Sequence, residues 1–147
     1  MMLDHTQIAS RIPHAGSMCL LHEVLSWDAQ QIRTRALSHR QADNPLRNRD
    51  GLGIAAGIEY AAQTMAVHGS LLSEGGTPRP GRLASTRGVQ CHTRWLDRVD
   101  GDLDIVARKI SGDDTGMIYD FEISAGPQRL LSGRASVALA PLDTSPA

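Results

Sequence analysis

Small side chains crowd the middle of the chain, from residue 54 to residue 72, at the spacing of an α-helix. One face repeats at steps of three and four residues, and its members are Ile54, Ile58, Ala61, Met65, Gly69 and Leu72. The other faces carry Ala55, Gly57, Ala62 and Ala66. Because such short side chains let neighbouring backbone approach the axis, we predict one helix of about five turns that other elements wrap on most sides.

The segments on both sides of this helix have the pattern of half-buried β-strands, in which apolar and polar residues alternate. After the helix, the pattern predicts four strands, at residues 89–95, 103–110, 117–124 and 131–139. Before the helix, weaker alternation predicts two strands, at residues 18–27 and 31–38. Glycine and proline residues between 73 and 81 end the helix and return the chain to the sheet.

One helix among about six mostly antiparallel strands is an α+β arrangement, in which the sheet must curl around the helix to cover it. That arrangement is the hotdog fold. The length of 147 residues suits a single domain, residues 1–147, with enough core to fold without disulfides or metal. Residues 141–147 include two prolines and little to bury, so we expect this tail to fray.

Composition excludes several classes of protein. A formal net charge of -1 supplies no basic field for nucleic acid, so no polynucleotide partner is expected. Cys19 and Cys91 form no C-x-x-C pair and the histidines show no metal-ligand spacing, so we predict two reduced, buried thiols and no metal site. The first residues lack a signal core and no segment is long and apolar enough to span a bilayer, so we expect a cytoplasmic protein without membrane insertion.

Two side chains stand out as candidates for acid–base chemistry. Glu59 lies inside the helical segment among apolar and small residues, where a solvated charge is unusual, and Gln63 follows one turn later. His39 closes the second predicted strand and opens an irregular loop that leads toward the helix. A histidine and a carboxyl from these two elements could act as base and acid on one substrate. The alternative is that both face water, Glu59 on an amphipathic helix and His39 in a loop.

The remaining histidines and the glycines near the helix start have plainer interpretations. His14 lies in a rigid turn and is interpreted as structural, whereas His68 and His92 are interpreted as surface or groove residues. The glycines form no dinucleotide fingerprint, because no G-x-G-x-x-G follows a strand. Around Gly57 they free backbone N–H groups near a helix N-terminus, which could polarise a carbonyl oxygen.

Several of these segments together resemble a known family. Ile12-Pro-His-Ala-Gly-Ser-Met-Cys-Leu-Leu-His-Glu-Val resembles the N-terminal I-P-H…L-L-D-x-V segment of the 3-hydroxyacyl acyl-carrier-protein dehydratases of fatty-acid synthesis, and Ile58-Glu-Tyr-Ala-Ala-Gln63 resembles their E-A-M-A-Q. Asn44-Pro-Leu-Arg47 and the segment from Gly57 to Gly69 are similar to the dehydratase-like subfamily found with aryl-polyene and related lipid clusters. The resemblance covers residues 12–72.

The resemblance implies elimination of water from a 3-hydroxyacyl thioester on acyl carrier protein, giving a trans-2-enoyl thioester. By this resemblance His39 removes the C2 proton, and Glu59, held protonated by apolar surroundings, protonates the departing C3 hydroxyl. Asn44, Gln63 and Gly57 are implied as supporting or substrate-binding residues, with N–H groups near Gly57 on the thioester carbonyl. No cofactor is implied.

Two kinds of partner also follow from the resemblance. One is the acyl carrier protein, whose acyl chain would run beside Ala55, Ala62 and Ala66. The other is a second subunit, because such hotdog sites are shared across a dimer, so we expect a homodimer or a heterodimer with a related dehydratase. A weakly basic face could dock an acidic carrier or its phosphopantetheine phosphate, although such side chains are commonly just solvated. Its candidate residues are Arg33, Arg35, Arg82, Arg87 and Arg94.

Two alternatives remain open at this stage. A hotdog thioesterase also places a carboxylate on this helix but uses it to activate water, and the loop from His39 to Asn44-Pro45 favours the dehydratase over it. That loop lacks the phenylalanine and glycine of the dehydratase pattern and has one extra residue. The departure favours a second alternative, a non-catalytic subunit of a hetero-oligomeric dehydratase.

Overall fold

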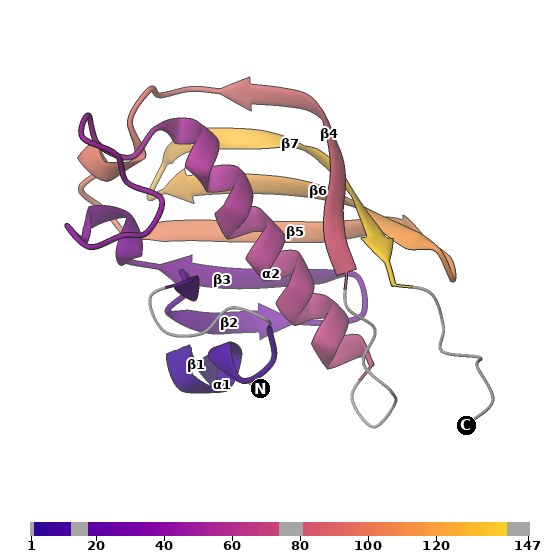
Figure 1. Ribbon diagram of the computed structural model, residues 1–147. Helices are drawn as coiled ribbons and strands as arrows, with labels where there is room; N and C mark the ends of the chain where they lie inside the picture. Colours follow the sequence, from indigo (N-terminus) through magenta and orange to yellow (C-terminus); the bar gives the residue numbers. More distant parts are fainter. Residues whose placement is uncertain (1, 13–17, 74–80, 141–147) are drawn as a thin grey trace.

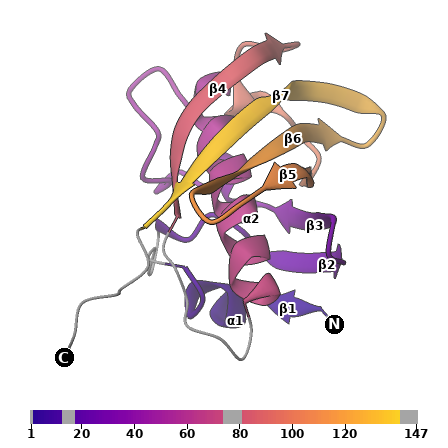
Figure 2. The ribbon, with the colours of Figure 1, turned by 90° about the vertical axis from the view of Figure 1, so that its right-hand side faces the viewer.

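The computed structural model describes residues 2–12, 18–73 and 81–140. These residues form one antiparallel sheet in the order β1-β2-β3-β5-β6-β7-β4, which curves around the helix α2 (Figures 1 and 2). The strands are β1 (Leu3–Asp4), β2 (Glu23–Trp27), β3 (Gln31–Ala36), β4 (Gly81–Cys91), β5 (Leu103–Gly112), β6 (Gly116–Ala125) and β7 (Gln128–Leu139). The helices are α1 (His5–Ala9), α2 (Gly57–Leu72) and the short 3-10 helices η2 (Ser38–Arg40), η3 (Ile54–Ala56) and η4 (Leu96–Arg98). The seventh strand, absent from the prediction, is the two-residue β1.

The predicted central helix is present, as η3 followed directly by α2. Its predicted face is confirmed in part: Ala61 and Met65 are buried, but Leu72 is 37% exposed. The buried face extends instead to Tyr60, Thr64 and Leu71. Thr64 is a polar residue on this buried face, and its hydroxyl is fully hydrogen-bonded: it donates to the Tyr60 carbonyl (3.0 Å) and lies 2.9 Å from the hydroxyl of Thr34 on β3. Hydrogen bonds thus allow polar residues to face the sheet.

The opposite side of α2 is less covered. Ala55 is exposed, and Ala62 and Ala66 are half-buried. The sheet of a single chain therefore does not enclose the helix completely, and the small-residue side remains accessible. None of the helices in the described residues is long and apolar enough to cross a membrane.

The strands after residue 103 follow the predicted alternation and run slightly longer than predicted. The prediction of a strand at 89–95 is wrong in its position, since β4 covers 81–91 and Trp95 lies in the connection before η4. Nearly every residue of β4 is exposed on both faces, so it shows no alternation that a sequence pattern could detect. The strand predicted at 18–27 begins only at Glu23, although Cys19, Leu20 and Leu21 before it are buried.

Two further predictions are corrected. Cys91 is exposed at the end of β4, whereas Cys19 is buried as expected. His68 is fully buried on α2, where Nδ1 lies 2.7 Å from the Tyr119 hydroxyl and Nε2 lies 2.7 Å from the Asp28 carbonyl. The predictions for His14 and for the tail at 141–147 concern positions outside the described residues.

Candidate functional site

His39 lies in η2, directly after β3, and its side chain is fully buried. The solvent-exposed alternative for this residue is therefore wrong. Its Nε2 atom lies 3.1 Å from the Val99 carbonyl, which can only accept, so Nε2 carries the proton in the neutral ring. Nδ1 is then the unprotonated nitrogen, and it has no hydrogen-bond partner among the described residues. Burial lowers the pKa of His39, against the opposing effect of the Val99 hydrogen bond, and so favours the neutral form.

A chain of hydrogen bonds ties the His39 loop to α2. The amide of Asn44 donates to the Tyr60 hydroxyl (2.9 Å), which lies 2.8 Å from the hydroxyl of Ser38. Ser38 in turn donates to the Leu20 carbonyl (2.8 Å), so the Tyr60 hydroxyl is the donor to Ser38. Asn44 also donates to the Ser38 carbonyl (2.9 Å). The residue next to His39 is thereby fixed to the helix residue next to Glu59.

Glu59 lies half-buried in the first turn of α2. The amide of Gln63, one turn along, donates to its Oε1 atom at 3.4 Å. Gln63 itself is buried and spans to the chain before β2: its oxygen accepts from the Leu20 N–H (2.9 Å) and its nitrogen donates to the Met18 carbonyl (2.8 Å). Gln63 therefore couples the orientation of Glu59 to the position of segment 18–20.

Gly57 is buried at the first position of α2, where side chains of β6 and β7 pack against it. A Cβ atom there would lie 2.7 Å from Leu131 Cδ2 and 3.2 Å from Ile123 Cδ1. Its N–H donates to the carbonyls of Ile54 and Ala55 within the preceding turn. The absence of a side chain thus serves packing, and the carbonyl-binding role of this N–H stays a prediction.

The two candidate catalytic residues lie on elements that are joined through Ser38 and Tyr60. His39 bonds to Val99 and Glu59 to Gln63, and no hydrogen bond or ion pair between His39 and Glu59 occurs within the described part of the chain. Asn44 bonds to Ser38 beside His39, and Gln63 bonds to Glu59, so the supporting role predicted for both stays a prediction. Tyr60, the partner of Asn44, and Val99, the partner of His39, were not found from the sequence, because these bonds join residues 16 and 60 positions apart.

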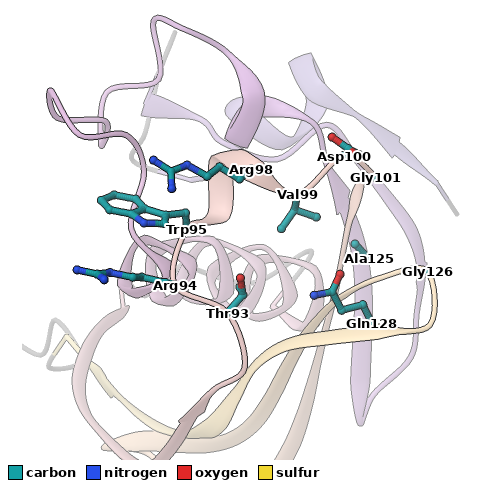
Figure 3. Close-up of a pocket in the computed structure, with 10 residues that line it drawn as sticks. All are labelled: Thr93, Arg94, Trp95, Arg98, Val99, Asp100, Gly101, Ala125, Gly126 and Gln128. Carbon is teal, nitrogen blue, oxygen red and sulfur yellow. The ribbon is translucent and has the colours of Figure 1, made fainter.

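A pocket of about 430 Å³ lies between η4 and the turn after β6, and Val99 is one of its lining residues (Figure 3). Its lining includes Arg94, Trp95 and Arg98, whose side chains extend together from one wall of the pocket. Arg94 is the only one of the five predicted docking arginines among its lining residues; Arg98 was missed. Across residues 2–12, 18–73 and 81–140, no group of three or more potential metal ligands comes together.

The other predicted docking arginines have different surroundings. Arg33 forms a bidentate ion pair with Asp104, and Arg35 pairs with Glu23 (2.8 Å), so their charges are offset locally. Arg82 and Arg87 are exposed along β4. A single basic face formed by all five residues is therefore not present.

Structural comparison places this arrangement among known folds. The chain is similar to a structure of the dehydratase heterocomplex ApeI:P from Xenorhabdus doucetiae, with a TM-score of 0.81 and 23% identity over 92% of this chain and 91% of that chain. It is also similar to a mutant thioesterase from Pseudomonas aeruginosa, with a TM-score of 0.68 and 16% identity over 95% and 96% of the two chains. A hypothetical thioesterase with coenzyme A from Streptococcus pneumoniae has a TM-score of 0.60 and 10% identity over 80% and 84%.

These likenesses and the sheet curled around one long helix define a hotdog-fold protein, as the sequence predicted. The family model for ApeP-like proteins, described as ApeP dehydratase, matches residues 6–145, and the chain therefore belongs to that family. The resemblance that was inferred from residues 12–72 is thus confirmed over almost the whole chain. A comparison with curated proteins finds no match.

Proposed function

We propose that this chain takes part in dehydration of a 3-hydroxyacyl thioester on acyl carrier protein, in aryl-polyene or a related lipid biosynthesis. The observation that carries the proposal is His39, whose Nε2–H is held by the Val99 carbonyl while Nδ1 has no partner among the described residues. A neutral imidazole in one fixed tautomer, with one nitrogen that has no hydrogen-bond partner among the described residues, is suited to act as a general base once substrate reaches it. Membership of the ApeP-like dehydratase family supports the same reaction.

The proposed reaction is a β-elimination across C2 and C3 of the acyl group. His39 Nδ1 takes the C2 proton, the electron pair of that bond forms the C2=C3 double bond, and the C3–O bond breaks. Glu59 in its protonated form gives its proton to the departing oxygen, which leaves as water. Gln63 would hold the Glu59 carboxyl toward the substrate, and Asn44, through Tyr60 and Ser38, would hold the His39 loop.

A second hotdog subunit is part of this proposal. No hydrogen bond or ion pair joins His39 to Glu59 among the described residues, and the small-residue side of α2 is only partly covered. β4 lies at the edge of the sheet and is exposed along its length, and such an edge commonly pairs with another chain. A subunit joined there would bring a second His39, or its counterpart, to the partly covered side of α2 near Glu59.

One observation favours a second candidate function, that of a non-catalytic subunit in a hetero-oligomeric dehydratase. The His39 ring is fully buried in the single chain, so a substrate reaches Nδ1 only if neighbouring residues move. The similar structure from Xenorhabdus doucetiae is itself described as a dehydratase heterocomplex. In this case the chain would support the catalytic residues of a related partner.

The test is intact-mass analysis of carrier protein loaded with a 3-hydroxyacyl group, incubated with the purified chain. The expected product has lost one water, and an enoyl-loaded carrier should gain one water in the reverse direction. His39→Gln and Glu59→Gln should abolish both changes. His92→Gln, which alters an exposed histidine, is the matched control and should leave them intact.

The other outcomes separate the alternatives. An unchanged acyl carrier, converted only after a related hotdog subunit is added, would replace the catalytic proposal with the non-catalytic subunit. Free carrier together with released acid would identify a thioesterase. Full activity in His39→Gln would remove this histidine from the mechanism.

A further inference from the structure

The pocket beside η4 has the chemistry of an anion site. The Arg98 guanidinium lies 4.7 Å from the centre of the Trp95 ring and that of Arg94 lies 5.8 Å from it, so two cationic groups flank one indole (Figure 3). Among the described residues, no carboxylate forms an ion pair with either arginine, in contrast to Arg33, Arg35 and Arg134. Arginine forks match phosphate oxygens in geometry and charge.

The wall that carries these side chains is held firmly by backbone contacts. The Arg94 carbonyl accepts from the Ile54 N–H (3.0 Å), and the Leu96 N–H donates to the Leu52 carbonyl (2.8 Å). Asp97, the acidic residue next to Arg98, is paired with Arg47 at 3.1 Å and is therefore engaged elsewhere. The two arginines are thus presented by a fixed loop while the nearest carboxylate in the sequence is occupied, which lowers the cost of binding an anion.

The rest of the pocket lining suits a ligand that has an anionic end followed by a polar, uncharged part. The pocket volume of about 430 Å³ is within the range of small-molecule sites. Thr93 and Gln128 add neutral hydrogen-bonding groups, and Asp100 is the one acidic residue of the lining, against two arginines. Figure 3 shows Asp100 on the side of the pocket away from Arg94, so the positive charge is concentrated at the Trp95 wall.

The pocket also adjoins the candidate catalytic residue. Val99 lines the pocket with its side chain, and its carbonyl accepts the hydrogen bond from His39 Nε2. A ligand anchored at Arg94 and Arg98 would therefore sit beside the segment that positions the base. A thioester on a long flexible arm with a phosphate at its far end has two suitable groups: the phosphate for the arginines and the thioester for the region beside His39.

We propose that Arg94, Trp95 and Arg98 form a subsite for the phosphate group of the phosphopantetheine arm that carries the acyl thioester. The substrate class rests on the proposed function, whereas the anion site rests on the pocket itself. The phosphate would lie at the edge of the indole, in the field of the two guanidinium groups that flank it, and the arm would run along the indole and past Val99. Arg98 and Arg94 are then binding residues and not parts of the acid–base pair.

Binding can be measured without any turnover. The chain has two tryptophans, so Trp27→Phe leaves Trp95 as the single indole reporter inside the proposed subsite. Titration of this variant with phosphopantetheine should give a saturable change in Trp95 emission, and pantetheine, which lacks the phosphate, should bind at least about tenfold more weakly. Adding Arg98→Gln or Arg94→Gln to this variant should weaken the binding of phosphopantetheine by a similar factor. Adding Arg108→Gln, the same charge change at an exposed position of β5, should not.

Three results would overturn the subsite. Equal affinity for pantetheine and phosphopantetheine would exclude recognition of the phosphate. An equal loss in the Arg108→Gln control would reduce the effect to overall charge. The third result is that carrier protein that lacks its arm binds tightly to the parent chain and loses this binding in Arg98→Gln. That result would mean that the arginines contact acidic side chains on the carrier surface and not the phosphate. A chain that binds phosphopantetheine as described but fails to dehydrate retains the subsite and loses only the proposed function.

Discussion

Tyr60 links the two candidate catalytic elements through one hydroxyl group. Its ring is fully buried, and its hydroxyl lies between Ser38 and Asn44 on the loop that carries His39. Burial raises the pKa of Tyr60, against the opposing effect of these hydrogen bonds, so the group stays a neutral donor. The loop that carries the buried His39 is therefore held by a phenol on the neighbouring helix.

Removing this hydroxyl should loosen the His39 loop with little change in apolar packing. We expect Tyr60→Phe to lower the free energy of unfolding by about 1–2 kcal/mol, because the Asn44 amide loses one partner in a buried place. Dehydratase activity should fall as well, since η2 is no longer fixed to α2. Urea denaturation and the carrier mass assay give the two readouts.

Tyr119→Phe is the matched control for this substitution. It removes the other buried tyrosine hydroxyl, which contacts His68 and not the His39 loop. It should cost comparable stability and spare activity. Equal losses of activity in both variants would show that the effect is general destabilisation.

The contact of α2 with the sheet depends on one glycine. At Gly57 a Cβ would come within 2.7 Å of Leu131 Cδ2, so Gly57→Ala forces the buried Leu131 side chain, the helix or the strand to shift and should cost about 1–3 kcal/mol of stability. At Gly69, in the same helix, a Cβ would meet only Met117 Cε at 3.7 Å, an ordinary contact. Gly69→Ala should therefore gain up to about 1 kcal/mol from helix propensity. Urea midpoints that move in the same direction for both variants would contradict this account.

Strands that pack one face against the core were predicted well from the sequence, and the strand that lacks such a face was not. Strands β5 to β7 have one face on the core, so their sequences alternate and their positions were predicted nearly to the residue. β4 has no fully buried residue, since only Leu83 and Val89 pack half-buried against the core, and such a strand carries no clear period of two. The segment at 19–21 is apolar because it is buried, not because it is a strand.

The same distinction applies to the candidate site. His39 and Glu59 could be proposed from residue type, spacing and the family resemblance, because those features lie within short segments. The partners that hold them could not, since Val99 lies 60 positions from His39 and Tyr60 lies 16 positions from Asn44. His68 was taken for a surface residue because its satisfying groups, on Tyr119 and Asp28, are distant in the sequence.

Stability of the whole molecule should depend on pH through two buried histidines. Burial lowers the pKa of both His39 and His68 below the ordinary value, which is about 6.5 in the unfolded chain. Below that pH the unfolded state binds protons that the native state does not, so the free energy of unfolding falls as pH falls. The slope approaches about 1.4 kcal/mol per pH unit for each histidine until its folded pKa is reached. Above this window the contribution is fully present.

Urea denaturation between about pH 5 and 7 tests this, because ordinary carboxylates titrate below that range. In His68→Gln one of the two titrating groups is gone, so the slope should be close to half that of the parent chain. A slope that is unchanged in this variant would contradict the assignment to His68.

Assembly should proceed through β4. This strand has one hydrogen-bonded neighbour, β7, in the described residues, and its other edge is left open over 11 residues. An open edge of that length favours pairing with a second chain. Thr86 lies at its middle and is exposed, so in a two-fold antiparallel pair it comes near its own copy. Thr86→Lys would bring two like charges together and should dissociate a homodimer, as measured by light scattering.

Ser111→Lys, which adds the same charge at an exposed position of β5, is the control and should leave the mass unchanged. A heterodimer would respond differently to Thr86→Lys, because only one of its two chains carries the lysine. Loss of self-association with retained binding to a related hotdog subunit would then favour a mixed assembly over a homodimer. An unchanged mass for Thr86→Lys alone would place the subunit contact elsewhere, and the shared site proposed at the partly covered side of α2 would lose its support.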